Sequence, residues 1–245
     1  MNANPSIHLG PQEQMPNEYH AIILAGGLGT RLRSAVPDLP KCMAPVAGKP
    51  FLQHLIEYLQ QAGINHFIFS LGYMHEVILD FLQTNYPNLS YDYVVEDEPL
   101  GTGGAIQKAC HKCEAKNVLI ANGDTMFKAD VKKLFSFHLQ HHADCTIALK
   151  PMYNFDRYGV VEIDADAHIK TFKEKQHYSE GLINGGIYIV NKTSLLSLSL
   201  PERFSFEKDY LEKYCQAQNM MGLIAEDYFI DIGIPEDFER ANREF

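Results

Sequence analysis

One glycine-rich turn, followed by two cations, holds the residue types best suited to chemistry in this sequence. The turn at residues 26–29 follows a short apolar run. Because glycine lacks a Cβ, the turn can take positive φ and present backbone N–H groups to an anion. Arg31 adds a fork of donors and Lys41 a point charge. We expect both to be exposed loop cations that bind a triphosphate; the alternative is an ordinary strand–helix connection.

Two aspartates are candidate ligands for the divalent cation that would accompany a triphosphate. Asp124 comes directly after an apolar run, and Asp231 lies in the string FIDIG. Mg²⁺ prefers one or two carboxylates together with phosphate oxygens and water. The alternative interpretation for each aspartate is a turn residue or a helix cap.

Alternating strands and helices must position these side chains. Strands are predicted at residues 21–25, 66–71, 91–95, 118–121, 145–149, 158–163, 169–172 and 186–190, and just before Asp231. Helices are predicted at residues 51–62, 74–85, 103–115, 131–141 and 205–215. Such alternation indicates parallel βαβ units, whose loops meet at the carboxyl edge of the sheet. The glycine turn, the loop at 101–105 and Asp124 should therefore converge.

Composition narrows the class of protein. The chain has 245 residues, is 46% hydrophobic and carries a formal net charge of −10, which argues against a nucleic-acid or anionic-membrane partner. It has no apolar run of membrane-spanning length and no signal-peptide pattern at its start. Its five cysteines form no disulfide framework. We expect reduced thiols and a cytoplasmic protein; the sequence leaves open whether it forms a homo-oligomer.

Two groups of cysteine and histidine invite a metal-site interpretation, and we expect neither to be one. Cys110 and Cys113 form a C-x-x-C without a second pair, inside a predicted helix. The histidines within residues 138–142 lie with Cys145 at a predicted helix end, where the helix dipole favours histidine.

The string L-A-G-G-x-G-T-R-L…P-K…P-V-x-G-K-P, read over residues 24–50, resembles the signature of the sugar-1-phosphate nucleotidyltransferases. The resemblance implies a Rossmann-like three-layer α/β/α fold with a mixed, mostly parallel sheet. The second half is expected to add a smaller, partly antiparallel sugar-binding layer. We expect a flexible extension at residues 1–19 and one domain at 20–245, with a nucleotide-binding lobe (20–150) and a sugar-binding lobe (151–245).

The resemblance also implies roles for individual residues. Catalytic roles fall on Arg31 for the departing pyrophosphate, Lys41 for the α-phosphate and Lys175 for the attacking sugar phosphate. Mg²⁺, with Mn²⁺ as a substitute, would be held by Asp124 and Asp231. Nucleotide binding is implied for Leu24, Ala25, Gly26, Gly27, Gly29, Thr30, Glu96, Gly101, Thr102, Asn122 and Gly123. Sugar-phosphate binding is implied for Gly159, Glu174, Lys175, Asn184 and Gly185, although Gln176 replaces the family proline.

Three further strings most resemble the bacterial guanylyltransferases that act on D-glycero-α-D-manno-heptose 1-phosphate. They are LRSAVPDLPKCMAPVAGKPFL, EPLGTGGAI and FIDIGIPEDFERA. This implies a reaction of GTP with that sugar, giving GDP-heptose for surface polysaccharides. The acidic run at residues 96–98 suits guanine, since carboxylates accept from its N1–H and amino group. The alternatives are a mannose-1-phosphate guanylyltransferase, a thymidylyl- or uridylyltransferase, and a regulatory homologue that only binds a nucleotide sugar.

Overall fold

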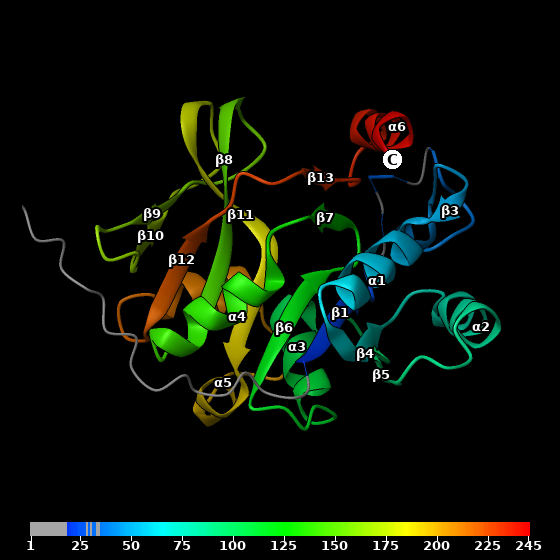
Figure 1. The fold of residues 1–245 in the computed structure, drawn as a ribbon, viewed down its shortest axis with the longest axis horizontal. Helices are drawn as coiled ribbons and strands as arrows, with labels where there is room; N and C mark the ends of the chain where they lie inside the picture. The colour runs from blue at the N-terminus through cyan, green and yellow to red at the C-terminus, as the bar shows by residue number, and fades with distance from the viewer. Residues whose placement is uncertain (1–18, 28, 30, 33–34) are drawn as a thin grey trace, which may run out of the picture.

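A seven-stranded sheet forms the centre of the molecule, in the strand order β12-β8-β11-β6-β1-β4-β5 (Figure 1). The computed structural model describes residues 19–27, 29, 31–32 and 35–245. Thr30 and most of the predicted N-terminal extension therefore lie outside the described residues. The strands of this sheet are β1 (Tyr19–Ala25), β4 (Ile64–Leu71), β5 (Tyr91–Val95), β6 (Asn117–Asn122), β8 (Cys145–Phe155), β11 (Tyr178–Asn191) and β12 (Met220–Ile224).

The sheet is mostly parallel because helices carry the chain back between successive strands. β1 pairs in parallel with both β4 and β6, β4 with β5, and β12 with β8. β11 runs antiparallel to β6 and β8 and joins the two halves of the chain in one sheet. This confirms the expected mixed, mostly parallel α/β architecture.

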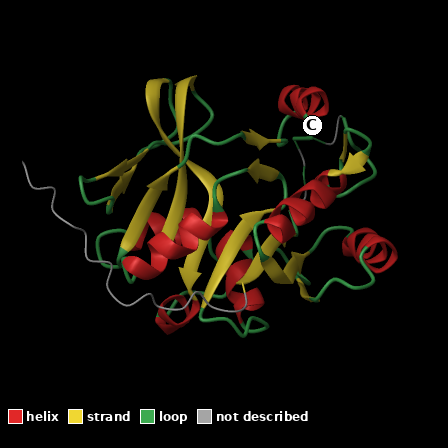
Figure 2. Ribbon diagram, in the orientation of Figure 1, coloured by secondary structure: helices red, strands yellow, loops and turns green. Residues whose placement is uncertain are grey.

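Alternating side chains along the strands explain the two helical layers (Figure 2). In β1, Ala21 and Ile23 face one core, whereas Ile22 faces the other. The first core packs under α1 (Phe51–Gln61), α2 (His75–Asn85) and α4 (Val131–Gln140). The second packs under α3 (Gly101–Cys110), α5 (Lys192–Ser197) and the π-helix η2 (Phe206–Glu212).

Three small two-stranded sheets and two helical elements surround this framework. The sheets pair β2 (Pro45–Val46) with β3 (Lys49–Pro50), β9 (Val161–Ile163) with β10 (Ile169–Phe172), and β7 (Thr125–Phe127) with β13 (Phe229–Asp231). The helical elements are the 3₁₀ turn η1 (Lys41–Met43) and the C-terminal helix α6 (Pro235–Glu244). None of the helices in the described part of the chain has the length and hydropathy needed to cross a bilayer.

The second half of the chain differs from its sequence-based prediction. Its strands β8, β11 and β12 extend the main sheet, whereas β9 pairs with β10, and β13 with β7, in separate small sheets. The predicted strand at 158–163 is confined to Val161–Ile163, and α5, β12 and α6 were not predicted. In the first half, the short elements η1, β2, β3 and β7 were not predicted either. The predicted helix at 103–115 begins at Gly101 and ends at Cys110.

The largest boundary error concerns β11, which begins at Tyr178 although the prediction began at residue 186. Glycines inside a strand weaken the sequence signal. Here they form a bulge: the pairing register with β8 shifts between Asn184 and Tyr188, and Gly186 takes φ +74°. A Cβ on Gly185 would lie 2.3 Å from the Phe127 ring, so only glycine fits there without a shift.

The cysteines and His138 lie in the core, whereas His141 is half-buried and His142 is exposed. All five cysteines are free and buried, and burial raises the pKa of the Cys110 thiol to about 12, which keeps it unreactive. His138 is 1% exposed. Its ring nitrogens lie 2.9 Å from Thr146 Oγ1 and 3.2 Å from Asn117 Oδ1, as in a neutral imidazole that accepts one hydrogen bond and donates the other.

His138 should make the stability of the fold depend on pH. Burial lowers its pKa to about 4, below the value of about 6.5 for an unfolded chain. As the pH falls below 6.5, the unfolded chain gains a proton that the folded chain does not, so stability is lost. We expect about 2 kcal/mol to disappear between pH 7.5 and 5. Urea unfolding across this range should show a flatter dependence for His138→Gln, whereas His111→Gln, at an exposed site, should keep the wild-type slope.

Candidate active site

A cavity of about 530 Å³ opens at the carboxyl edge of the parallel strands. It is lined by the loops that follow β1, β5 and β6, so the predicted convergence of these loops is confirmed. Thr30 lies outside the described residues, and every described residue that was predicted to bind the nucleotide lines the cavity. These residues are Leu24, Ala25, Gly26, Gly27, Gly29, Glu96, Gly101, Thr102, Asn122 and Gly123.

The glycines allow close approach of neighbouring segments beneath this cavity. A Cβ on Gly26 would lie 2.7 Å from Glu96 Oε1. Gly29 has φ +59° and lies against the Lys41 side chain. Gly123 donates its N–H to the Leu24 carbonyl at 2.9 Å. The glycine turn thus brings the loops of three strands together.

Glu96 is held in place by two hydrogen bonds at the wall of the first cavity. Its Oε2 accepts the Leu100 N–H at 2.8 Å, and Oε1 lies 3.5 Å from the Ser70 hydroxyl. The two following acids, Asp97 and Glu98, are exposed and do not line the cavity. Of the acidic run, only Glu96 lines the cavity.

A second cavity of about 460 Å³ adjoins the first on the side of the chain's second half. The predicted sugar-phosphate residues Gly159, Glu174, Lys175, Asn184 and Gly185 all line it. Arg31, Lys41, Asn122, Asp124 and Glu207 line both cavities. A ligand in one cavity therefore meets a ligand in the other beside these shared side chains.

Two of the predicted sugar-phosphate residues, Gly159 and Asn184, also have structural tasks. A Cβ on Gly159 would lie 2.3 Å from the Lys173 carbonyl oxygen, so this glycine allows the segment carrying Glu174 and Lys175 to pass close by. Asn184 donates its amide to the Tyr188 hydroxyl at 2.9 Å and accepts the Gly186 N–H at 3.0 Å. These two bonds hold the β11 bulge. Glu174 and Lys175 are exposed at the cavity rim.

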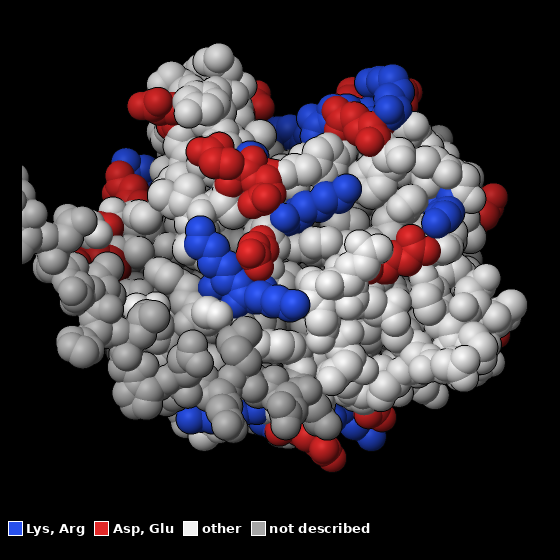
Figure 3. Space-filling view, viewed as in Figure 1, with Lys and Arg blue, Asp and Glu red and all other residues white. Residues whose placement is uncertain are grey.

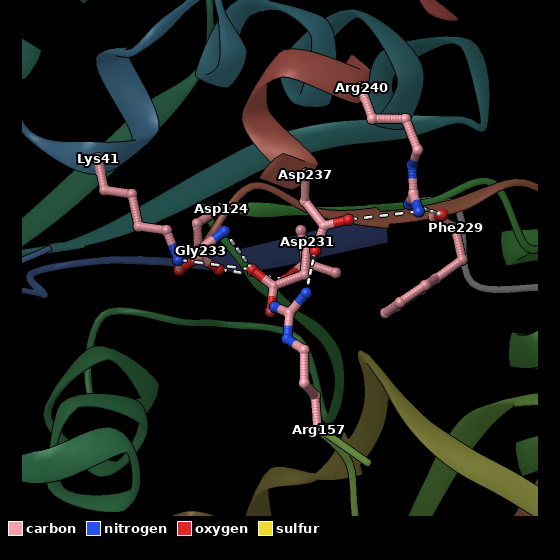
Figure 4. Close-up of polar contacts among 9 residues, drawn as sticks. Lys41, Asp124, Arg157, Phe229, Asp231, Gly233, Asp237 and Arg240 are labelled. Atoms are coloured by element: carbon pink, nitrogen blue, oxygen red, sulfur yellow. Dashed lines mark hydrogen bonds and ion pairs between the residues drawn. The ribbon is translucent and has the colours of Figure 1, made fainter. Parts of the chain in front are cut away.

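Asp124, Asp231 and Lys41 meet between the cavities (Figure 4). Lys41 Nζ lies 2.5 Å from Asp124 Oδ2 and 3.5 Å from Asp231 Oδ1. Pairing of β7 with β13 places Asp231 opposite Thr125, beside Asp124. The expectation that Lys41 is an exposed loop cation is wrong: its side chain is 14% exposed, because it begins η1 and extends between two carboxylates.

The two carboxylates create a local need for positive charge. Burial, and then the charge of Asp124, raise the pKa of Asp231. Arg157 approaches Asp231 from another side than Lys41, with Nη2 3.9 Å from Asp231 Oδ2 (Figure 4). Arg157 also pairs with Asp237 of α6, which pairs in turn with Arg240 at 3.3 Å. The C-terminal helix thereby fixes one side of the site.

Several site residues escaped the sequence-based prediction. Glu207 lines both cavities, Ser70 lines the first, and Arg157 contacts Asp231. Their local signals are weak: Ser205 and the acids after it indicate only a helix start. Which of those acids faces a cavity depends on how η2 packs.

The distribution of surface charge fits a protein that binds small anions in a local site. It does not fit a broad positive surface of the kind that binds a polyanion. On the face seen in Figure 3, basic and acidic side chains are interspersed. The described residues that line the cavities include five cationic side chains, Arg31, Lys41, Lys173, Lys175 and Lys208, on a chain with a net charge of −10. Such a cluster can hold phosphates locally although the protein as a whole is acidic.

The chain is similar to proteins of known activity over most of its length. It is 52% identical over 224 residues to a D-glycero-α-D-manno-heptose 1-phosphate guanylyltransferase of Aneurinibacillus thermoaerophilus, which covers 91% of this chain and 97% of that protein. A protein of the same name from Campylobacter jejuni is 44% identical, with 89% and 96% covered.

Solved structures show the same fold. The crystal structure of HddC from Yersinia pseudotuberculosis matches with a TM-score of 0.84 and 42% identity, over 93% of this chain and 99% of that chain. HddC complexed with GMP-PN also matches with a TM-score of 0.84. A family model described as nucleotidyl transferase matches residues 20–245. The chain belongs to the nucleotidyl transferase family.

Proposed function

We propose that this protein is a sugar-1-phosphate guanylyltransferase that condenses GTP with D-glycero-α-D-manno-heptose 1-phosphate. The products are GDP-heptose and pyrophosphate. The observation that carries the proposal is the pair of adjoining cavities, which share Arg31, Lys41 and Asp124. The names of two relatives, at 52% and 44% identity, supply the substrates. Among the alternatives, a regulatory homologue is disfavoured because the shared charged side chains are all present.

The reaction needs positioning and charge stabilisation rather than a protein nucleophile. An anionic oxygen of the sugar phosphate attacks the α-phosphorus of GTP in line, the new P–O bond forms, and the bond to pyrophosphate breaks. The attacking oxygen is already an anion, so no general base is required. Lys175 would hold the sugar phosphate, Lys41 the α-phosphate and Arg31 the departing pyrophosphate. Together they reduce the repulsion between two polyanions.

Asp124 and Asp231 fit a Mg²⁺ ion. The two carboxylates converge on Lys41 Nζ, and burial, followed by the neighbouring charge of Asp124, raises the pKa of Asp231. No larger group of acidic, histidine or cysteine ligands gathers among the residues that the structure describes. That donor set suits Mg²⁺, which takes few carboxylates and completes its shell with phosphate oxygens and water. When bound, the ion would neutralise charge developing on the phosphates.

The proposal also assigns one substrate to each lobe of the protein. Residues 20–150 would bind the nucleotide and residues 151–245 the sugar phosphate, because the first cavity is lined mainly by the former segment and the second mainly by the latter. Glu207 and Gly233 are exceptions, since they reach the first cavity from the second half. Five buried free cysteines are compatible with a reducing compartment, the cytoplasm.

Pyrophosphate release tests the proposal. We expect kcat/KM to be highest for GTP when GTP, ATP, UTP, CTP and dTTP are each paired with heptose, mannose and glucose 1-phosphates. Heptose and mannose differ by one hydroxymethyl group, so these two sugars should differ by about 10- to 200-fold at most. A preference for dTTP or UTP with every sugar would contradict guanylyl transfer. A preference for glucose 1-phosphate over both manno sugars would contradict the heptose assignment.

A further inference from the structure

Glu207 is a carboxylate of the cavities for which, unlike Asp124, Asp231, Glu96 and Glu174, the sequence predicted no role. It comes from η2, a segment distant in sequence from the glycine turn, and lines both cavities. A carboxylate repels phosphate oxygens, so it must lie where another part of the substrates passes. Hydroxyl groups are the donors that a carboxylate recognises, and both the ribose and the sugar carry several.

The carboxylate is fixed before any substrate arrives. Its Oε2 accepts hydrogen bonds from the Thr102 hydroxyl at 2.6 Å and the Ser205 hydroxyl at 3.0 Å. The Thr102 hydroxyl in turn accepts the Phe206 N–H at 2.9 Å. Within the described part of the chain, the hydrogen bonds to this carboxylate all go to Oε2. Oε1 therefore keeps its capacity to accept from a ligand.

The elements that carry these groups are clamped together. The Gly103 N–H donates to the Phe204 carbonyl at 3.0 Å, and a Cβ on Gly103 would lie only 2.1 Å from the Phe204 ring. Phe206 packs edge-on against Tyr188 of β11, with ring centroids 5.2 Å apart. The start of α3 thus holds the start of η2 at a fixed distance, which is what a positioned acceptor requires.

The Thr102 hydroxyl is engaged within the protein. It donates to Glu207 and accepts from the Phe206 N–H, so it orients the carboxylate, and nucleotide binding by Thr102 stays a prediction. The loop that borders the base is in this way linked through Glu207 to the cavity for the sugar.

We propose that Glu207 is a specificity-determining residue that accepts hydrogen bonds from the hydroxyls of a vicinal diol where the two substrates meet. The diol belongs either to the ribose of the nucleotide or to the sugar of the sugar 1-phosphate. The proposal rests on the proposed function. A hydrogen bond to a charged acceptor typically changes affinity by about 10- to 100-fold, which sets the expected effect.

Glu207→Gln is the main variant. The amide oxygen can still accept from Thr102 and Ser205, while the other position becomes a donor, so the fold should persist; the melting temperature checks this. For wild type, kcat/KM is measured with GTP, 2′-deoxy-GTP and 3′-deoxy-GTP, and with sugar 1-phosphates lacking single hydroxyls. We expect one deoxy substrate to be about 10- to 100-fold poorer for wild type, and nearly equal to its parent for Glu207→Gln.

The two series of deoxy substrates identify which substrate carries the diol. Selective loss with deoxyguanosine triphosphates assigns the ribose, and selective loss with deoxy sugars assigns the sugar. Glu180→Gln, which alters an exposed carboxylate of β11 outside both cavities, should keep all wild-type ratios. If wild type uses every deoxy substrate as well as its parent, or if Glu207→Gln keeps the wild-type ratios, the proposal is wrong.

Calorimetry separates this proposal from the proposed function. The measurement is the affinity of wild type and of Glu207→Gln for one substrate at a time, so that no turnover occurs. One set of titrations uses GTP, 2′-deoxy-GTP and 3′-deoxy-GTP, and a separate set uses the sugar 1-phosphates. Should wild type show no guanylyl transfer while its affinities still depend on one hydroxyl and on Glu207, the reaction assignment fails and the role of Glu207 stands. Normal turnover, with affinities and rates that depend on none of the hydroxyls, would instead overturn the role of Glu207 and leave the reaction assignment intact.

Discussion

Lys41→Ala is expected to lower kcat by about 10²- to 10³-fold, the usual cost of removing a preorganised charged group from a reacting centre. Lys41 Nζ lies 2.5 Å from Asp124 and its side chain is 14% exposed, so the ammonium is held in place before substrates bind. Arg31→Ala should have a similar effect, because Arg31 lines both cavities. Pyrophosphate release under saturating substrates provides the measurement.

Lys49→Ala is the matched control for this variant. Lys49 also follows the glycine turn, but its side chain is 48% exposed and pairs with Glu57 at 3.4 Å. It should retain wild-type turnover. Lys41→Ala should also bind Mn²⁺ more tightly than wild type in the absence of nucleotide, because Asp124 and Asp231 lose their resident positive charge. Wild-type kcat in Lys41→Ala would contradict the proposed contact with the α-phosphate.

Asp124→Asn is expected to reduce kcat by about 10³-fold or more, since a bound metal ion supplies several kcal/mol of charge stabilisation. Asp231→Asn should follow the same direction. EDTA should abolish activity, and Mg²⁺ or Mn²⁺ should restore it. Mn²⁺ binding, followed by electron paramagnetic resonance in the presence of a non-hydrolysable GTP analogue, gives a readout that is independent of turnover and should weaken in both variants.

Asp227→Asn controls for the loss of one negative charge in the same C-terminal segment. Asp227 is exposed and lines neither cavity, so Mn²⁺ affinity and kcat should be unchanged. If Asp124→Asn and Asp231→Asn bind Mn²⁺ as tightly as wild type, these aspartates do not hold the ion. The Lys41 contact would then be a structural ion pair.

Local patterns were sufficient to predict the main-sheet strands and the α-helices in the first half of the fold, but not its short elements η1, β2, β3 and β7. The apolar run that ends at Ala25 and the helical periodicity of residues 51–62 each describe one element within a few residues of its bounds. The second half was harder to predict because β11 contains glycines that end a strand in most contexts. There, pairing with β6 and β8 on both sides compensates for the weak local preference.

Residue types and their spacing were enough to establish the family resemblance and the parallel direction of the first strands. Together with that resemblance, they also indicated most residues that line the two cavities. These features lie along single loops or strands, so the sequence contains them directly. Only folding in three dimensions established which distant groups meet: Lys41 between Asp124 and Asp231, Arg157 beside Asp231, and Glu207 locked by Thr102. Such contacts join segments separated by as many as 190 positions, and their geometry depends on the packing of whole elements, for which no local pattern exists.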